Sequence, residues 1–134
     1  MRAVIEYGHP GAHQRNHDQR HHGGERWQDV GGASVIGIAS MTSYFGFEWT
    51  PGYGPAKAGL NNLTVGLAGT LGPTVRVNCI VPGPFLTDIS KAWTDEARET
   101  ADNAQGRPGR PEEIVTAALF LASPSSSFTN GALV

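Results

Sequence analysis

The sequence predicts an α/β fold in which helices flank a small parallel sheet. Two short apolar runs rich in β-branched residues, 33–39 and 75–81, have the length and composition of strands buried in a sheet. A helix-forming segment, 55–71, lies between them, and two further helical segments follow the second run. Strands that alternate with helices in this way pair in parallel through right-handed crossovers.

Glycine and proline mark the ends of the first predicted strand and helix. Residues 33–39 (ASVIGIA) follow two glycines, and a loop rich in aromatic residues occupies 41–52. Pro55 suits the first turn of a helix, and recurring apolar residues extend that helix to Leu71. Gly72–Pro73 then stops it, so the loop and the helix together are expected to connect the two strands.

The second half of the chain predicts a strand, two helices and the start of another strand. Residues 75–81 (VRVNCIV) end at a Pro-Gly pair, and a polar helix is expected over 94–104. Pro111 is followed by two acidic residues, which is typical of a helix start, and this helix is expected to run to Ala122. A last apolar stretch, 132–134, predicts a strand that the chain leaves incomplete.

The composition changes sharply near residue 30, which predicts two parts. Residues 1–30 are polar without a sustained helical or strand period, so we expect a disordered tail before an ordered domain over 31–134. All five histidines of the chain lie in this tail, and four of them are spaced by four residues: His9, His13, His17 and His21. That spacing leaves a metal-binding tail as an alternative, although a proline and several glycines interrupt any helix there.

Charge and cysteine content exclude several classes of protein. The net charge of −2 gives no electrostatic reason to expect nucleic acid or an anionic membrane as a partner. No apolar run is long enough to span a bilayer, and the N-terminus lacks the apolar core of a secretion signal. The single cysteine, Cys79, excludes an intrachain disulfide and lies in an apolar run, where a core role is expected. We therefore expect a cytoplasmic protein.

Three residues suggest acid–base chemistry at the edge of the predicted sheet. Tyr53 and Lys57 are four residues apart near a helix start, so their side chains share a face. A phenol is a poor base near neutrality, but a nearby ammonium and a helix N-terminus both favour the phenolate. Ser40 directly follows a predicted strand and could hydrogen-bond the same substrate oxygen. The Pro82–Gly83 pair follows the other strand, and ligands of open parallel sheets bind at this edge.

The order and spacing of several motifs resemble the short-chain dehydrogenase/reductase family. Ser40 precedes Tyr53 by 13 residues, and the Y-x-x-x-K pair is followed by a P-G-x-x-x-T segment. A G-R-P-G-R-P-E-E segment at 106–113 then precedes a helix that ends in F-L-A-S. The resemblance covers about Gly32–Val134 and implies the C-terminal half of a Rossmann-like domain, with a partial parallel sheet and flanking helices.

The resemblance implies a function and a set of site residues. It implies an NAD(P)-dependent oxidoreductase that transfers hydride between nicotinamide and a secondary alcohol or ketone, without nucleic acid or membrane. In this interpretation Tyr53 is the acid/base, Ser40 orients the substrate, and Lys57 favours the ionised tyrosine and binds the nicotinamide ribose. Tyr53 is expected to contact the cofactor as well. Pro82, Gly83 and Thr87 match the segment that borders the nicotinamide. Complete relatives are expected to be homo-oligomers, either dimers or tetramers.

One half of the expected cofactor site is missing from the sequence. A dinucleotide needs a Gly-rich turn between a first strand and helix, where backbone N–H groups meet the pyrophosphate. No such turn follows a predicted strand here, and the residue that would select NAD or NADP is missing with it. The alternative hypothesis is therefore a truncated, catalytically inactive fragment, or a subunit-interaction module that uses the helix over 55–71.

Overall fold

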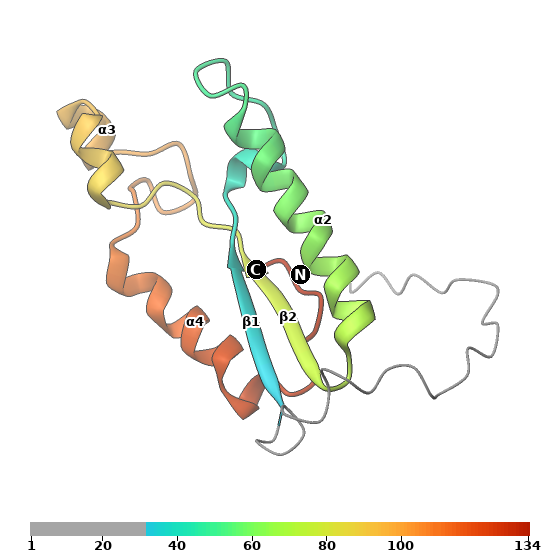
Figure 1. Cartoon of the computed structure of the whole chain (residues 1–134). Helices are drawn as coiled ribbons and strands as arrows, with labels where there is room; N and C mark the ends of the chain where they lie inside the picture. The colour runs from blue at the N-terminus through green and yellow to red at the C-terminus, as the bar shows by residue number, and fades with distance from the viewer. Residues whose placement is uncertain (1–31) are drawn as a thin grey trace.

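The protein was analysed as a computed structural model that describes residues 32–134. Two strands, β1 (Ala33–Ile38) and β2 (Val75–Ile80), form a parallel sheet with Ala33 opposite Val75 and Ile38 opposite Ile80. Helices α2 (Tyr53–Leu71) and α4 (Val115–Ala122) lie on opposite sides of this sheet (Figure 1). The predicted α/β class and both predicted strands are thus confirmed. The expected tail and its histidines fall outside the described residues.

Helix α2 begins two residues earlier than the sequence predicted. The amide of Tyr53 donates to the Thr50 carbonyl at 3.1 Å, and the amide of Ala56 donates to the Gly52 carbonyl at 3.4 Å. A turn before the helix therefore continues directly into it. Pro55 is the third residue of the helix, within the first turn, where its missing N–H leaves no intrahelical bond unmade.

Helix α3 (Asp95–Glu99) is shorter than the polar helix predicted over 94–104. The Thr94 side chain caps its start by accepting a hydrogen bond from the Ala97 amide at 3.2 Å. Thr100 is extended, with φ −125° and ψ 150°, so the helix stops there. This segment lacks an apolar stripe to pack against the sheet, and helices without tertiary packing are marginal. The predicted extent was therefore wrong, although the helix itself exists.

The last predicted helix starts and ends where expected, but its first turn is a 3₁₀ helix, η3 (Pro111–Ile114). Helix α4 continues from it and ends at Ala122. The Leu121 carbonyl near that end accepts hydrogen bonds from Ser34 Oγ at 2.7 Å and from Arg76 Nη1 at 3.0 Å. One residue from each strand therefore holds the C-terminal end of α4 against the sheet.

The C-terminal residues lie along the second edge of β2. Leu133 forms a parallel bridge with Cys79, which confirms that a strand begins where the sequence predicted one. The Asn78 side chain, fully buried, donates to the Thr129 carbonyl at 2.9 Å and accepts from the Ala132 amide at 2.9 Å. β2 is thus central, between β1 and the C-terminal residues.

The other edge of β1 has no strand beside it within residues 32–134. Val35 and Ile38 on β1 are 46% and 50% exposed, whereas Val77 and Cys79 on β2 are buried. The sheet is therefore covered well around β2 and poorly around β1. Within the described part of the chain, no helix is long and apolar enough to cross a membrane.

Candidate active site

The ends of the two strands bring the predicted site residues to one edge of the sheet. Just beyond β1, the Ala39 amide donates to the Ile80 carbonyl at 2.8 Å, and the Met41 amide donates to the Pro82 carbonyl at 2.9 Å. Ser40 therefore lies between two residues that are hydrogen-bonded to the end of β2. The expected common edge for Ser40 and the Pro82–Gly83 pair is confirmed.

Ser40 is the residue that caps the short 3₁₀ helix η1 (Met41–Ser43). Its backbone is extended, and its Oγ accepts a hydrogen bond from the Thr42 amide at 3.3 Å. A hydroxyl that accepts in this way keeps its own hydrogen free to donate. The half-buried Ser40 side chain can therefore still donate a hydrogen bond to a ligand oxygen.

Tyr53 and Lys57 lie together at the start of α2, as their spacing predicted. Lys57 Nζ is 5.5 Å from the centroid of the Tyr53 ring, within the range of a cation–π contact. The same ammonium donates to the Ile38 carbonyl at 2.8 Å, which ties α2 to the last residue of β1. Tyr53 is 45% exposed, so its hydroxyl is within reach of a ligand. Two of the three N–H bonds of an ammonium remain available at Lys57.

The segment after β2 carries the residues expected to border the nicotinamide. Gly83 is exposed and lies beside Met41, whose Sδ would be 3.7 Å from a Cβ added at Gly83. Thr87 is exposed and caps η2 (Asp88–Ala92) through its backbone, while its hydroxyl makes no capping hydrogen bond. A surface hollow of about 470 Å³ borders Thr87 and is lined in part by Lys91 and Arg98. The Gly83 backbone and the Thr87 hydroxyl are therefore available to a ligand along this segment.

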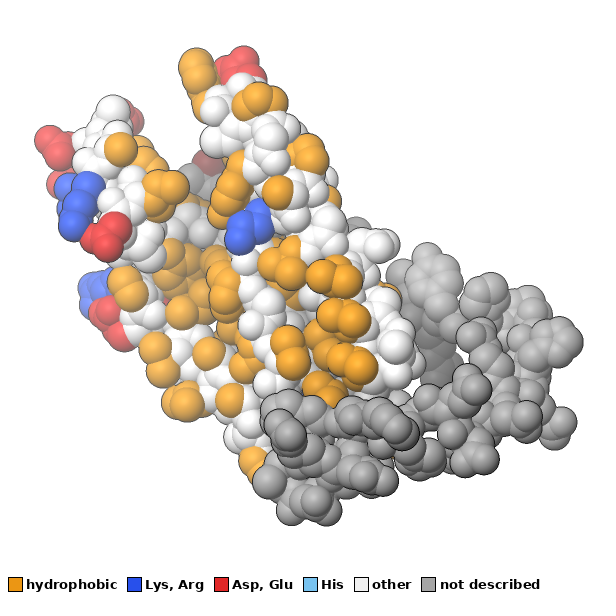
Figure 2. Space-filling model, in the orientation of Figure 1, with side chains coloured by type: hydrophobic (Ala, Val, Ile, Leu, Met, Phe, Trp, Pro, Cys, Tyr) orange, Lys and Arg blue, Asp and Glu red, His pale blue; other side chains and the backbone are white. Residues whose placement is uncertain are grey.

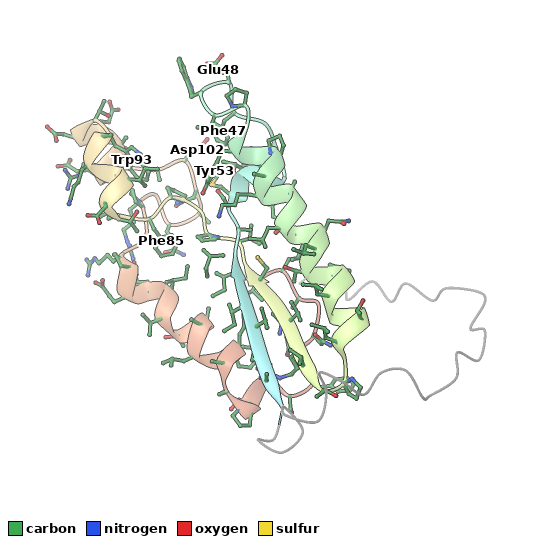
Figure 3. The ribbon with its side chains drawn as sticks, viewed as in Figure 1. Phe47, Glu48, Tyr53, Phe85, Trp93 and Asp102 are labelled. Atoms are coloured by element: carbon green, nitrogen blue, oxygen red, sulfur yellow. The ribbon has the colours of Figure 1, made fainter. Side chains whose placement is uncertain are left out.

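The space-filling view shows the molecule hollowed between two projecting parts (Figure 2). One part contains the start of α2 and the aromatic loop before it, and the other contains α3. Phe47 and Tyr53 lie on the α2 side of this gap and Trp93 lies on the α3 side (Figure 3). Phe47 is 41% exposed and packs against Phe45, with 5.4 Å between ring centroids and the rings tilted by 47°. Aromatic side chains therefore border the side of Tyr53 that is open to a ligand.

Sequence reasoning missed one contact that joins η1, the turn after Ser40, to α2. Asn61 Nδ2 donates to Ser43 Oγ at 2.7 Å, and neither residue belongs to the predicted motifs. Asn61 is only 8% exposed, and its Oδ1 has no hydrogen-bond partner in the described region. Tyr53, Lys57 and Asn61 are each four residues apart, so one helix face carries all three. That spacing was the available signal, and it places Asn61 as the support of the turn that starts at Ser40.

Replacement of Asn61 with alanine is expected to destabilise the fold by about 0.5–1.5 kcal/mol, because the half-buried Ser43 hydroxyl loses the hydrogen bond from Asn61. Asn62, the next residue along, is exposed and makes no side-chain hydrogen bond in the described region, so Asn62→Ala is the matched control. Urea unfolding followed by far-UV circular dichroism measures both free energies of unfolding. Equal losses for the two variants would contradict a supporting role for Asn61.

No group of three metal-ligating side chains occurs among residues 32–134. The histidines behind the metal alternative lie outside this range, so that alternative stays a prediction. Cys79 is fully buried and unpaired, which agrees with the core position expected for it.

Known proteins with similar sequences share most of the described part of this chain. Residues 25–134 match the family profile described as enoyl-(acyl carrier protein) reductase. The chain is 39% identical over 101 residues to 3-oxoacyl-[acyl-carrier-protein] reductase FabG of Chlamydia trachomatis, covering 73% of this chain and 41% of that protein. It is also 39% identical over 105 residues to D-xylose 1-dehydrogenase of Caulobacter vibrioides, covering 75% and 42%.

Solved structures agree with these sequence relatives. A protein provisionally assigned as a gluconate dehydrogenase from Agrobacterium tumefaciens superposes with a TM-score of 0.75 at 30% identity, covering 83% of this chain and 46% of that one. A protein provisionally assigned as an NAD(P)-dependent gluconate 5-dehydrogenase from Beutenbergia cavernae, whose crystal structure holds NADP at low occupancy, has a TM-score of 0.68 at 33% identity and covers 79% and 45%.

The chain belongs to the short-chain dehydrogenase/reductase family, a family of oxidoreductases with a Rossmann fold. It spans about two fifths of the length of the curated relatives given above. The predicted family and fold are therefore confirmed.

Proposed function

We propose that this chain carries the catalytic part of an NAD(P)-dependent oxidoreductase that interconverts a secondary alcohol and a ketone. The observation that supports this most is the placement of Tyr53 and Lys57. The ammonium lies 5.5 Å from the tyrosine ring and is tied to the end of β1, beside Ser40. A tyrosine with a cation at this distance is a suitable group for general acid–base chemistry on a substrate oxygen.

Each of the three residues has a separate role in the proposed reaction. The nicotinamide, when bound, supplies or takes the hydride. Tyr53 Oη gives a proton to the carbonyl oxygen during reduction and takes it back during oxidation. Ser40 Oγ donates a hydrogen bond to the same oxygen and so fixes its position. Lys57 holds α2 against the end of β1 and offers its remaining N–H bonds to the nicotinamide ribose.

The residues present fit the nicotinamide end of a dinucleotide. Lys57 has N–H bonds available for ribose hydroxyls, and the Thr87 hydroxyl and the Gly83 backbone offer polar groups for a carboxamide. Among residues 32–134, no Gly-rich turn leads from a strand into a helix, so these residues offer no equivalent fit for the pyrophosphate. These residues surround the nicotinamide end alone, so the proposal covers both NAD and NADP.

Titration of the purified chain with NADH and with NADPH tests the proposal. We expect saturable quenching of tryptophan fluorescence, because Trp93 lies across the gap from Tyr53 (Figure 3). We also expect oxidation of the reduced nucleotide when a ketone is added, which is followed by the loss of its absorbance. No saturable binding with either nucleotide would overturn the proposal for this chain.

A second candidate is a non-catalytic subunit-interaction module that pairs with a copy of itself. Leu63 and Val65, which flank the buried Thr64 on α2, are 53% and 48% exposed, so apolar side chains on this helix are available for a homo-oligomer contact. A concentration-dependent mass in sedimentation equilibrium, together with no nucleotide binding, would favour this candidate over the first. Nucleotide binding with turnover would favour the enzyme.

We further propose a cytoplasmic location. Cys79 is fully buried and has no disulfide partner, as expected for a protein of a reducing compartment.

A further inference from the structure

The loop between α3 and η3 is joined to the segment that carries the proposed nicotinamide contacts. The Gly109 amide donates to the Pro84 carbonyl at 2.9 Å, and the Leu86 amide donates to the Gly109 carbonyl at 2.8 Å. Phe85 and Gly109 thus form an isolated parallel bridge between two stretches of chain that belong to no strand. Thr87 comes directly after Leu86. The bridge to Gly109 therefore fixes the backbone that leads into Thr87, and with it the position of Thr87.

Gly109 fits this bridge because it lacks a side chain. A Cβ at Gly109 would lie 2.6–2.9 Å from three atoms of the Phe85 ring. Such distances are shorter than van der Waals contact, so any larger residue would require the ring or the loop to move. The bridge therefore depends on glycine at this position and on a fixed path for the loop.

An ion pair fixes that path from the other side of the loop. Arg107 Nη1 and Nη2 donate to the two Glu113 carboxylate oxygens at 2.8 and 2.6 Å. Glu113 Oε2 also accepts from the Arg110 amide at 2.7 Å, and Arg107 Nη1 donates to the Pro108 carbonyl at 2.9 Å. The carboxylate and the guanidinium together therefore hold residues 107–110 as a closed turn around Gly109.

The carboxylate at the centre of this turn stays ionised over the neutral pH range. The hydrogen bond from Arg107, then the one from the Arg110 amide, lower the pKa of Glu113 from 4.5 to about 2. Both side chains of the pair are about two fifths exposed, and exposed ion pairs add little to global stability. We therefore expect the Arg107–Glu113 ion pair to fix the local conformation of the loop, with little effect on the free energy of unfolding.

We propose that Arg107 and Glu113 are positioning residues for the nicotinamide side of the site. They hold Gly109 in place, and the bridge from Gly109 to Phe85 then holds the Pro84–Thr87 segment. The inference rests on the proposed function, because that function gives Thr87 and its neighbours their contact with nicotinamide. Arg107 and Glu113 themselves touch neither substrate nor cofactor in this scheme.

Amide hydrogen exchange of the full chain, measured by NMR near neutral pH, tests the mechanical part of the proposal. Glu113→Ala should speed the exchange of the Leu86 and Gly109 amides roughly tenfold, as expected for a lost charged hydrogen bond. The Cys79 and Val81 amides, which bond to the C-terminal residues, should keep their rates. Glu113→Gln retains one acceptor and should restore much of the protection. Glu112→Ala removes a neighbouring acid without an ion pair in the described region and should resemble the unsubstituted chain.

The proposal is overturned if Glu113→Ala leaves the Leu86 and Gly109 amides unchanged. It is also overturned if the sheet amides speed up equally, because the effect would then be global unfolding. Gly109→Ala provides a second route to the same result, since the added methyl group should displace Phe85 and deprotect the Leu86 amide while the ion pair remains.

Binding of NADH tests the functional part separately. Glu113→Ala should weaken NADH binding about tenfold relative to the unsubstituted chain, in parallel with the loss of amide protection. Unchanged NADH affinity with faster amides would overturn the role toward nicotinamide. An unsubstituted chain that binds no NADH would overturn the proposed function and this role with it. The exchange rates need no cofactor, so they still show whether the ion pair holds the segment.

Discussion

Tyr53→Phe is expected to lower the rate of NADH-dependent ketone reduction by roughly 10²–10⁴-fold, the usual contribution of a general acid. The substitution removes only the hydroxyl oxygen, and the ring stays beside the Lys57 ammonium. Nucleotide binding should therefore be almost unchanged, while turnover is lost. Steady-state kinetics for turnover and fluorescence titration for binding separate these two effects.

Tyr44→Phe is the matched control for this experiment. Tyr44 lies nine residues earlier in the aromatic loop, is 62% exposed, and makes no hydrogen bond through its hydroxyl within the described region. Its substitution should leave turnover at the level of the unsubstituted chain. Equal activity of the Tyr53→Phe and unsubstituted chains would remove Tyr53 as the acid/base, whereas a Tyr44→Phe loss of similar size would point to damage of the aromatic loop.

The features that the sequence predicted correctly are those with a local physical cause. β1 and β2 are short β-branched or apolar runs bounded by glycine or proline, and those patterns require no knowledge of the rest of the fold. The common edge for Ser40 and Pro82 also followed, because parallel strands present their carboxyl ends on the same side. The Met41–Pro82 hydrogen bond agrees with that reasoning.

The features that the sequence predicted less well depend on distant contacts. The helix expected over 94–104 stops at Glu99 because none of its residues is buried against the rest of the fold. Helix propensity is a local property and does not predict such tertiary packing. The start of α2 was placed at Pro55, since proline favours the first turn, but the preceding turn at Thr50–Gly52 extends the helix to Tyr53. Helix ends are the part of an element that tertiary structure adjusts most easily.

Two contacts near the site could not be predicted from local sequence patterns. They are the hydrogen bond between Asn61 and Ser43 and the bridge between Gly109 and Phe85. Asn61 meets Ser43 across 18 residues, and neither residue is unusual for its own segment. Arg107 and Glu113 belong to the G-R-P-G-R-P-E-E segment, which on its own indicates only a loop followed by a helix start. Glu113 caps the start of η3 by accepting a hydrogen bond from the Arg110 amide, but no local pattern in the sequence indicates the bridge between Gly109 and Phe85.

Leu121→Ala is expected to destabilise the fold by about 2–5 kcal/mol, the range for truncating a fully buried leucine. Leu121 is 0% exposed, and its backbone carbonyl accepts from Ser34, Arg76 and Ser126. A cavity at this point therefore lies where α4 is fixed to both strands. The sheet is small and poorly covered around β1, so little other packing can compensate for the loss.

Leu119→Ala in the same helix is the control, because Leu119 is 64% exposed and its truncation leaves no cavity. Its cost should be within about 0.5 kcal/mol, as for other surface substitutions. Guanidinium unfolding of both variants measures the difference, and an unchanged denaturant slope would show that the unfolding transition itself is the same. Equal destabilisation by the two substitutions would mean that α4 does not pack on the sheet through Leu121.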